Sequence, residues 1–449
     1  MLKRACFTRV FARPLLLFAI LGSGGCVSSA YIQNPIEIFL ANQQPELALN
    51  THEQLPHKSR NQALYHLNKA VLLRMNGQLN DSNTELEAAK QISQKLDAVS
   101  LREQTAAVSV NDAMRSYLPP PYEQVMLYCF KMLNYLELND LDGARVEALQ
   151  LDVFLQQKYK GKEPPFARYL SGLVFEANGE LSDALIAYRK ALQAYQVANI
   201  KIPQQLQADL LRLTEHQSLK DEHRKFSEAF KLDNWITQAE LSKQGEIIAI
   251  AFSGLVPRKH ETSIMAQDPD SGQLHRISIP FYEQRQSDVK SMHLVSLNKH
   301  QTGELFANIE QQANASLNDQ MPGIMGRAIA RVAVKNKLSD NMSKENQLLG
   351  VITNIAGFIS EQADTRSWYT LPQEIIIGRM PLTPDTHDIK VILNNRTGTS
   401  INEREINQVS LQQKQKLFFS WHWPASTVTS RKRNHANTTT STTIIYRSR

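Results

Sequence analysis

The stretch PFARYLSGLVFEANGELSDALIAYRKALQAY, residues 165–195, decides the fold of the first half of this chain. Its apolar residues follow a helical period, which predicts amphipathic helices. Gly172 and Ala184 lack bulk, so two helices could approach closely there, and the rings of Phe175 and Tyr188 would fill the volume between them. The stretch therefore predicts a helical hairpin.

The turn of this hairpin falls at Gly179. Glycine permits the left-handed conformation that ends a helix, and Ser182 and Asp183 favour the start of the next helix. The hairpin resembles a tetratricopeptide repeat, a motif of roughly 34 residues. The resemblance is carried by Gly172, Phe175, Gly179, Ala184, Tyr188 and Ala191.

Weaker copies of the pattern occur at residues 127–157 and 65–92, with turns at Asn139 and Gly77. Irregular inserts separate the copies. We expect a tetratricopeptide-like solenoid over residues 26–235, and a generic helical bundle with the same apolar stripes is the alternative. Helices at 204–217 and 220–232 are expected to close the array.

Repeat arrays of this kind present a concave face to a peptide or protein. The side chains expected on that face are largely apolar. The candidate partner-binding residues are Tyr169, Leu173, Glu176, Cys129 and Leu133. Each could instead be an ordinary packing residue, and Cys129, an unpaired cysteine in an apolar helix, has the character of a small core hydrophobe.

From residue 245 the sequence changes to strand patterns. GEIIAIAFSGLVP at 245–257 is a buried-strand run. Further strands are expected at 275–282, 291–297, 374–380, 388–393 and 415–423, and helices at 303–317, 323–338 and 347–361. The sequence thus predicts an α+β multidomain chain: an all-α solenoid, a smaller α+β domain at 245–423, and a disordered tail at 424–449.

The first 26 residues, MLKRACFTRVFARPLLLFAILGSGGC, have the features of a secretory leader. A basic start precedes a short apolar run, which cannot cross a bilayer because that needs about 20 residues. The Gly-Gly-Cys ending resembles the lipobox of bacterial lipoproteins, although Ser23 stands where leucine is usual. The resemblance implies a signal peptide at 1–25 and acylation of Cys26. The alternative is an ordinary leader cleaved elsewhere.

Val27 and Ser28 follow the cysteine, and no aspartate does. In lipoproteins of two-membrane bacteria this resembles sorting to the outer membrane. We therefore expect a cell-envelope location with the chain facing the periplasm.

The net charge of +6 is concentrated at the two ends of the chain. Residues 1–25 carry four basic residues and no acid, and residues 431–449 carry five and no acid, so removing both leaves a body of charge −3. A mildly acidic body is a poor partner for phosphate backbones, and we expect no nucleic-acid binding. Three cysteines, of which two lie in the leader region, exclude a disulfide framework.

Motifs for enzymatic chemistry are missing from the sequence. There is no zinc-protease motif, nucleophile elbow, phosphate-binding loop or Cys-x-x-Cys pair, and the histidines lack ligand spacing. We therefore expect neither an enzyme nor a cofactor or metal site.

One interpretation of Asp364, Arg366 and Trp368 is a ligand-binding cluster that holds a carboxylate or a sugar. The alternative is structural: Asp364 accepts from the backbone, Arg366 pairs locally and Trp368 packs into the domain. Trp421 and Trp423 also have two interpretations. They could line a glycan-binding surface, or they could share one buried face of a strand.

The chain resembles an uncharacterised family of tetratricopeptide-containing lipoproteins of Gram-negative bacteria over most of residues 26–423. The stretches FARYLSGLVFEANGELSDALIAYRKAL and ADTRSWYTLP carry the resemblance. It implies a membrane-anchored scaffold that binds an envelope protein in cell-envelope or peptidoglycan assembly. A glycan-binding or glycan-processing C-terminal domain and a purely structural lipoprotein are the alternatives.

Overall fold

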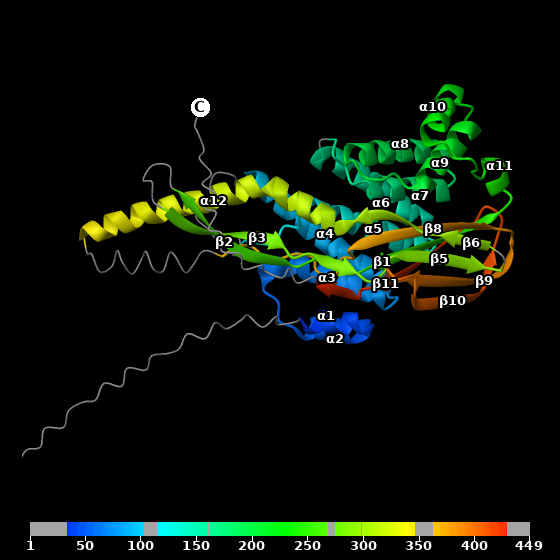
Figure 1. The fold of residues 1–449 in the computed structure, drawn as a ribbon. Helices are drawn as coiled ribbons and strands as arrows, with labels where there is room; N and C mark the ends of the chain where they lie inside the picture. Colours follow the sequence, from blue (N-terminus) through cyan, green and yellow to red (C-terminus); the bar gives the residue numbers. More distant parts are fainter. Residues whose placement is uncertain are drawn as a thin grey trace, which may run out of the picture. The chain divides into compact units, whose positions relative to one another are not determined.

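The computed structural model describes residues 34–102, 115–159, 161–267, 274–297, 299–345 and 362–428. The expected signal peptide, Cys26, the helix expected at 347–361 and the tail beyond Val428 lie outside the described residues. The chain divides into Met1–Asn34 and a compact unit that begins at Pro35. Figure 1 shows the helices and strands of the second unit.

The first part of this unit is a row of helical hairpins. Each hairpin pairs an odd-numbered helix with the helix that follows it. Their bounds are α1 Pro35–Ala41, α2 Pro45–Gln54, α3 Gln62–Met75, α4 Leu79–Arg102, α5 Pro121–Glu137, α6 Leu141–Lys158, α7 Pro165–Ala177, α8 Leu181–Val197, α9 Gln204–His216 and α10 Lys220–Phe230. The helical region expected from the repeats is confirmed.

The turns between paired helices share one backbone feature, a residue in the left-handed region. These residues are Gln43, Gly77, Asn139, Gly179 and Ser218, with φ between 57° and 78°. The second helix of each pair begins two residues later. The turns expected at 77, 139 and 179 are therefore confirmed, and the left-handed residue explains why each first helix ends there.

Gly172 allows the close approach of α7 and α8. A Cβ built on Gly172 would lie 2.3 Å from Cε1 of Tyr188, which is closer than two carbon atoms can pack. The expectation that Tyr188 fills the space opposite a residue without a side chain is confirmed.

The second part is rich in strands that form two four-stranded sheets. The inner sheet has the order β11-β1-β8-β7 and the outer sheet β10-β9-β5-β6. The inner strands are β1 Gly245–Ser253, β7 Glu304–Asn308, β8 Glu374–Leu382 and β11 Lys416–Trp423, and the outer strands are β5 Ser291–Ser296, β6 Lys299–Thr302, β9 Asp385–Asn394 and β10 Ser400–Leu411. In the inner sheet, β11 runs parallel to β1, and the other pairs are antiparallel.

Smaller elements complete the described chain. They are the 3-10 helix η1 Ser59–Asn61, the short helix α11 Gln238–Leu241, the hairpin of β2 Lys259–Gln267 and β3 Leu274–Tyr282, the pair of β4 Arg285–Ser287 and β12 Ser426–Val428, and the long helix α12 Ile309–Glu345. The combination of a helical region and a strand-rich part confirms the α+β class.

Strand β1 lies between two apolar layers, and every residue in it is buried. Ile248 and Ile250 belong to a core cluster that they share with the helices. Ile247 and Ala249, which point the other way because side chains alternate along a strand, belong to the core between the two sheets. Residues 26–235 and 245–423 were expected as two domains, and the structure shows that the inner sheet and the helices share one core.

Several expected elements differ in the structure. Residues 304–308 form a strand instead of the start of a helix, because they pair with the edge of β8. The helices expected at 303–317 and 323–338 are one helix, α12, with Pro322 inside it. Ser426–Val428 form strand β12 where the tail was expected to begin. None of the described helices is long and apolar enough to cross a membrane.

Candidate functional site

The inner face of the helical row, formed by α5, α7 and α9, is covered by the chain's own inner sheet. Helix α5 contacts β11, and α7 contacts β7. The five residues expected to contact a partner are buried: Tyr169, Leu173, Cys129 and Leu133 are 0% exposed and Glu176 is 5% exposed. Tyr169 and Glu176 face the inner sheet, where they contact Phe306 and Arg379. In this structure all five side chains are enclosed by the chain itself, so none of them is accessible to a partner.

Strand β7 packs against the inner face of the helical row, in the way that a bound peptide would. The ring of Phe306 lies 4.2 Å from the ring of Tyr169, centroid to centroid. The hydroxyl of Tyr195 donates to the Phe306 carbonyl at 2.7 Å. The carboxylate of Glu304 accepts from the backbone N–H groups of Gln204 and Gln205 at 2.8 and 2.7 Å, at the start of α9, where a negative charge is favourable.

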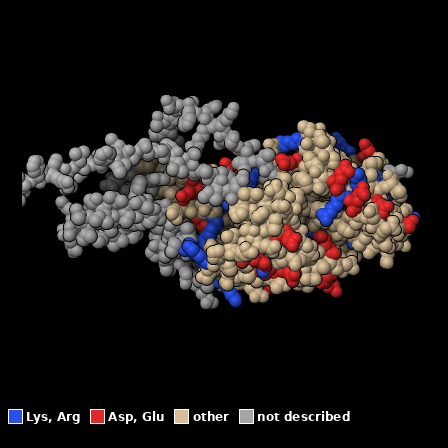
Figure 2. Space-filling view, turned by 90° about the horizontal axis from the view of Figure 1, so that it is seen from below, with Lys and Arg blue, Asp and Glu red and all other residues tan. Residues whose placement is uncertain are grey.

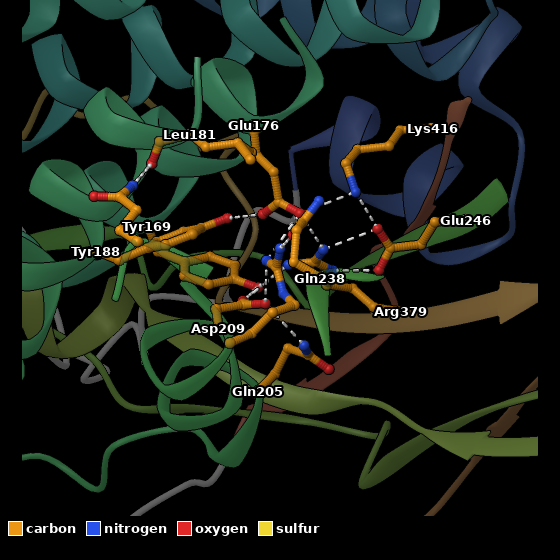
Figure 3. Close-up of polar contacts among 12 residues, drawn as sticks. Tyr169, Glu176, Leu181, Tyr188, Gln205, Asp209, Gln238, Glu246, Arg379 and Lys416 are labelled. Atoms are coloured by element: carbon orange, nitrogen blue, oxygen red, sulfur yellow. Dashed lines mark hydrogen bonds and ion pairs between the residues drawn. The ribbon is translucent and has the colours of Figure 1, made fainter. Parts of the chain in front are cut away.

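Three carboxylates and three cations meet between the helices and the inner sheet, and we call them the charge network. Figure 3 labels five of its members, Glu176, Asp209, Glu246, Arg379 and Lys416, which converge from α7, α9, β1, β8 and β11. Each is a nearly inaccessible side chain, at most 9% exposed. The members are Glu176, Asp209, Glu246, Arg212, Arg379 and Lys416.

Arg379 is the centre of the charge network. Its Nε and Nη2 donate to both oxygens of Glu246, at 2.6 and 2.8 Å. Its Nη1 donates to Oδ2 of Asp209 at 2.8 Å, and its Nη2 also reaches Oε1 of Glu176 at 3.2 Å. One guanidinium thus contacts all three carboxylates, and a planar group with five donors suits that arrangement.

The remaining cations close the network. Nη2 of Arg212 lies 2.9 Å from Oε1 of Glu176 and 3.0 Å from Oδ1 of Asp209. Nζ of Lys416 lies 3.0 Å from Glu176 and also contacts Glu246. The formal charges of the three carboxylates and three cations cancel when all six groups are ionised. Burial raises the pKa of Asp209, although Arg379 and Arg212 act in the opposite direction.

Tyrosines contribute the last hydrogen bonds. The Tyr188 hydroxyl donates to Oε2 of Glu176 at 2.7 Å, and the Tyr169 hydroxyl donates to Oδ2 of Asp209 at 3.2 Å. Burial raises the pKa of both tyrosines well above its ordinary value, and the nearby carboxylates raise it further, so both hydroxyls stay protonated donors.

The electrostatics keep two of the carboxylates ionised. Burial alone would raise the pKa of Glu176, but Arg212, Lys416 and Arg379 outweigh burial and hold that pKa well below its usual range. Burial is likewise outweighed at Glu246, where Arg379 and Lys416 lower the pKa to about 2. No member of the network is both accessible and unpaired, so the arrangement suits structural stabilisation better than acid–base chemistry.

The residues of the second expected site, Asp364, Arg366 and Trp368, make contacts within the chain. Arg366 donates to both oxygens of Asp364, at 2.8 and 2.6 Å, and its backbone N–H donates to Oδ1 at 3.0 Å. Trp368 is 0% exposed, and its Nε1 donates to Thr370 at 2.9 Å. The structure therefore brings Asp364 and Arg366 together as a pair and places Trp368 inside the core. The glycan-binding hypothesis gains no support from this geometry.

Strand β11 contains Trp421 and Trp423, for which a glycan surface and a shared strand face were the two interpretations. Trp421 and Trp423 lie half-buried on one strand face, against the core between the sheets. His422 points to the opposite face, where it stacks on Phe252 with 4.4 Å between ring centroids. The two tryptophans thus share one strand face.

Glu123 is a buried group that the sequence did not reveal. It is 0% exposed, and it accepts from the Tyr117 hydroxyl at 2.6 Å, the Tyr122 hydroxyl at 3.1 Å and the Trp368 backbone N–H at 3.0 Å. Burial raises its pKa. The only sequence feature that pointed to this position is the proline-rich run before Glu123. The structure shows that this run packs on the start of α5, where the Gln124 side chain donates to the Pro119 carbonyl.

The outer side of the helical row is open. A groove of about 450 Å³ lies among α4, α5 and α6, and another of about 700 Å³ lies among α2, α3 and α4. On the face in Figure 2, cationic and anionic side chains are interspersed over a larger uncharged surface, and neither sign forms a continuous patch. The described residues contain no group of three or more His, Cys, Asp or Glu side chains placed to hold a metal ion.

Comparison with known proteins gives structural neighbours but no family. No family model and no curated protein sequence matches the chain. Among solved structures, a Podosopora anserina kinesin light chain-like repeat protein is 15% identical with a TM-score of 0.31, covering 44% of this chain and 90% of that one. MamA AMB-1 is 11% identical with a TM-score of 0.29, covering 46% of this chain and 91% of that one.

A third neighbour is the Rap conjugation regulator of plasmid pLS20 in complex with the Phr* peptide. It is 18% identical with a TM-score of 0.29, covering 43% of this chain and 49% of that one. The likenesses are too low to assign a family, and the repeat character of this chain is established by its own hairpins, their left-handed turns and the close packing at Gly172.

Proposed function

We propose that this protein is a lipid-anchored scaffold of the bacterial cell envelope that holds a protein partner close to a membrane. The observation that supports the proposal best is the charge network. It joins α7 and α9 to three strands of the inner sheet, so helices and strands form one body instead of two domains that move independently. A body of that kind suits a fixed spacer or docking platform.

The leader supplies the membrane part of the proposal. Pro35, the first residue of α1, follows Cys26 by nine residues. A fully extended chain advances at most ~3.6 Å per residue, so an acylated Cys26 would keep α1 within about 30 Å of the lipid. Two or three acyl chains would make that attachment firm, where one chain would be marginal.

The open outer surface suits a protein partner. Because the chain's own strands fill the inner face, a partner would bind on the second helices of the hairpins or at the grooves between them. The members of the charge network are buried and paired with one another, which favours a framework role over catalysis.

Membrane attachment can be tested in intact cells with an alkyne-labelled fatty acid. We expect the wild-type protein to incorporate the label and fractionate with the outer membrane, and we expect Cys26→Ser to lose both properties. Cys129→Ser is the matched control, because Cys129 is buried and should carry no label. Unlabelled wild-type protein, or an unchanged location of Cys26→Ser, would refute the anchor.

Partner binding is tested by chemical crosslinking in intact cells followed by purification of the full-length protein. We expect a defined envelope protein to be recovered with the wild-type chain and to be lost with Cys26→Ser. Recovery of the chain alone would contradict the scaffold proposal.

A further inference from the structure

Helix α6 carries an exposed apolar row on its outer side. Val146 is 49% exposed, Leu149 is 44% exposed and Val153 is 53% exposed. Their spacing of three and four residues places them on one face of the helix, along about 10 Å of its length. Exposed apolar side chains are ordinary when scattered, but a contiguous row is a feature that needs an explanation.

The chain's other hairpins provide an internal comparison. The second helix of every hairpin begins two residues after its left-handed turn residue, so positions can be aligned by their distance from the turn. Val146, Leu149 and Val153 lie 7, 10 and 14 residues after Asn139. The residues at these distances in the other second helices are Asn50 and Glu53 in α2, Thr84, Glu87 and Gln91 in α4, Ile186, Arg189 and Gln193 in α8, and Lys225 and Glu228 in α10.

Among the described hairpins, α6 alone has apolar residues at all three outward positions. Of the other second helices, only α4 and α8 extend to the third position, and α2 and α10 end before it. The repeat fold does not require apolar residues there, because the other four helices have mostly polar residues at the positions they share with α6. The apolar row is therefore particular to α6 and not a consequence of how the array packs.

The row continues into the groove among α4, α5 and α6. Val153 also lines that groove, together with Leu127, Tyr128 and Phe154. The groove has a volume of about 450 Å³, within the range of ligand-binding clefts. We call Val146, Leu149, Val153 and these three groove residues the α6 surface.

The charged groups around the α6 surface are paired within the chain. Nζ of Lys158 lies 2.8 Å from Asp97, and Nζ of Lys90 lies 3.3 Å from Glu147. Much of the remaining polar lining consists of amides, including Gln94, Gln150 and Gln157. A matching partner therefore needs an apolar face with uncharged flanks.

The size of the surface argues against a second copy of this chain. The exposed parts of the three side chains in the row amount to roughly 200–300 Å², far below the ~800 Å² per partner that a stable complex of two folded proteins buries. That area fits a short helix, which docks through a few apolar residues at i, i+3 or i+4, and i+7.

We propose that the α6 surface binds an amphipathic helix of the envelope partner through apolar contacts. This inference rests on the proposed scaffold function and specifies where and how the partner binds. Leu149 and Val153 fit between apolar side chains of the incoming helix, and the groove takes one further side chain beside Tyr128. Because the local charges are already paired, the contact is insensitive to salt.

Site-specific photocrosslinking in intact cells provides the test. Benzoylphenylalanine replaces Val153 in the full-length protein, and the matched control places it at Gln193, the same position of α8. We expect at least ten times more adduct from position 153, joined to the apolar face of a helical segment in another protein. Equal yields, no adduct, or an adduct with lipid or with a second copy of this chain would overturn the proposal.

Two variants sharpen the result. Val146→Thr combined with Leu149→Gln should reduce the adduct at position 153 at least tenfold, and Ile186→Thr, an exposed residue of α8, should leave it unchanged. Equal melting temperatures would show that all variants are folded. The adduct yield should stay constant between about 0.1 and about 0.5 M salt, and a steep fall would indicate a charged contact instead.

The outcomes separate this inference from the proposed function. If crosslinking recovers the partner but the α6 variants retain it, the α6 surface is wrong and the scaffold stands. If the α6 adduct forms while Cys26→Ser leaves the protein where it was, the docking surface stands and the anchor is wrong.

Discussion

At the scale of single residues, Arg379 joins the helices to the inner sheet. It is fully enclosed, and its guanidinium contacts Glu246, Asp209 and Glu176. Removing one partner from a buried ionic network is more costly than removing the whole network, because the remaining charges lose their compensation in a medium of low polarity.

Arg379→Met should therefore lower the free energy of unfolding by about 3–5 kcal/mol. Urea unfolding followed by circular dichroism measures the change. Arg224→Met is the control, since the Arg224–Asp221 pair is on the surface and its loss should leave the midpoint unchanged. Similar midpoints for Arg379→Met and the wild type would show that the network does not stabilise the fold.

Glu246 gives the network a pH dependence with a definite sign. Its pKa in the folded protein, about 2, lies below the ordinary value of 4.5. The ionised form is therefore favoured by folding, so its contribution is complete above about pH 4.5 and is lost as the pH falls towards 2.

Unfolding free energies measured between pH 5 and about pH 2.5 should fall more steeply for the wild type than for Glu246→Gln, which cannot lose this charge. Other carboxylates titrate in both proteins, so the difference between the two curves isolates Glu246. Parallel curves would contradict the lowered pKa.

At the scale of elements, strand β7 acts as the chain's own ligand for the inner helical face. Phe306 points towards the helices and is 2% exposed, whereas its neighbour Leu305 is 48% exposed. Because side chains alternate along a strand, Phe306 points into the inner helical face and Leu305 lies near solvent.

Phe306→Ala should destabilise the protein by about 3–5 kcal/mol, because it leaves a cavity beside Tyr169. Leu305→Ala, a change on the other face of the same strand, should have a much smaller effect. Thermal unfolding of both variants measures the difference. Equal losses of stability would mean that Phe306 does not anchor β7 to the inner helical face.

The pair of α7 and α8 depends on the absence of a side chain at Gly172. Gly172→Ala should cost about 1–3 kcal/mol through overpacking against Tyr188. Gly326→Ala, in α12 where a Cβ meets nothing within 4 Å, should be neutral or stabilising. A neutral Gly172→Ala would show that the two helices separate easily.

At the scale of the whole molecule, the shared core determines whether the helical part can fold without the strands. The core beneath the inner sheet contains residues of the helices together with Ile248, Phe306 and Phe418. Removing the strands would expose a broad apolar surface and leave Glu176, Asp209 and Arg212 without three of their partners.

A fragment of residues 26–235 should consequently be aggregation-prone or bind a hydrophobic dye such as ANS, and the full chain should unfold in one cooperative transition. Calorimetry and dye binding of the two proteins provide the comparison. A fragment that unfolds cooperatively with little dye binding would show that the helices form an independent domain.

The expectations that were confirmed depend on local patterns. The turns at Gly77, Asn139 and Gly179 and the contact of Gly172 with Tyr188 follow from residue type and spacing over one hairpin. The expectations that failed depend on distant pairing. Residues 304–308 are a strand because β8 offers a free edge, and no pattern within five residues specifies that partner.

The candidate sites show the same division. The sequence identified Tyr169 and Glu176 as inner-face residues, but it could not show that Arg379, about 200 positions later, covers them. Likewise, the α6 row was present in the sequence, and its exposure became evident only when the surrounding helices were in place.

By itself, the sequence determined the helical hairpins, their turns and the change to strands near residue 245, because backbone preference and side-chain volume act between near neighbours. The tertiary structure decided that the inner sheet fills the helical face and that three carboxylates meet three cations there. Those contacts join residues from five elements, and their stability comes from burial, which exists only once the elements are packed together.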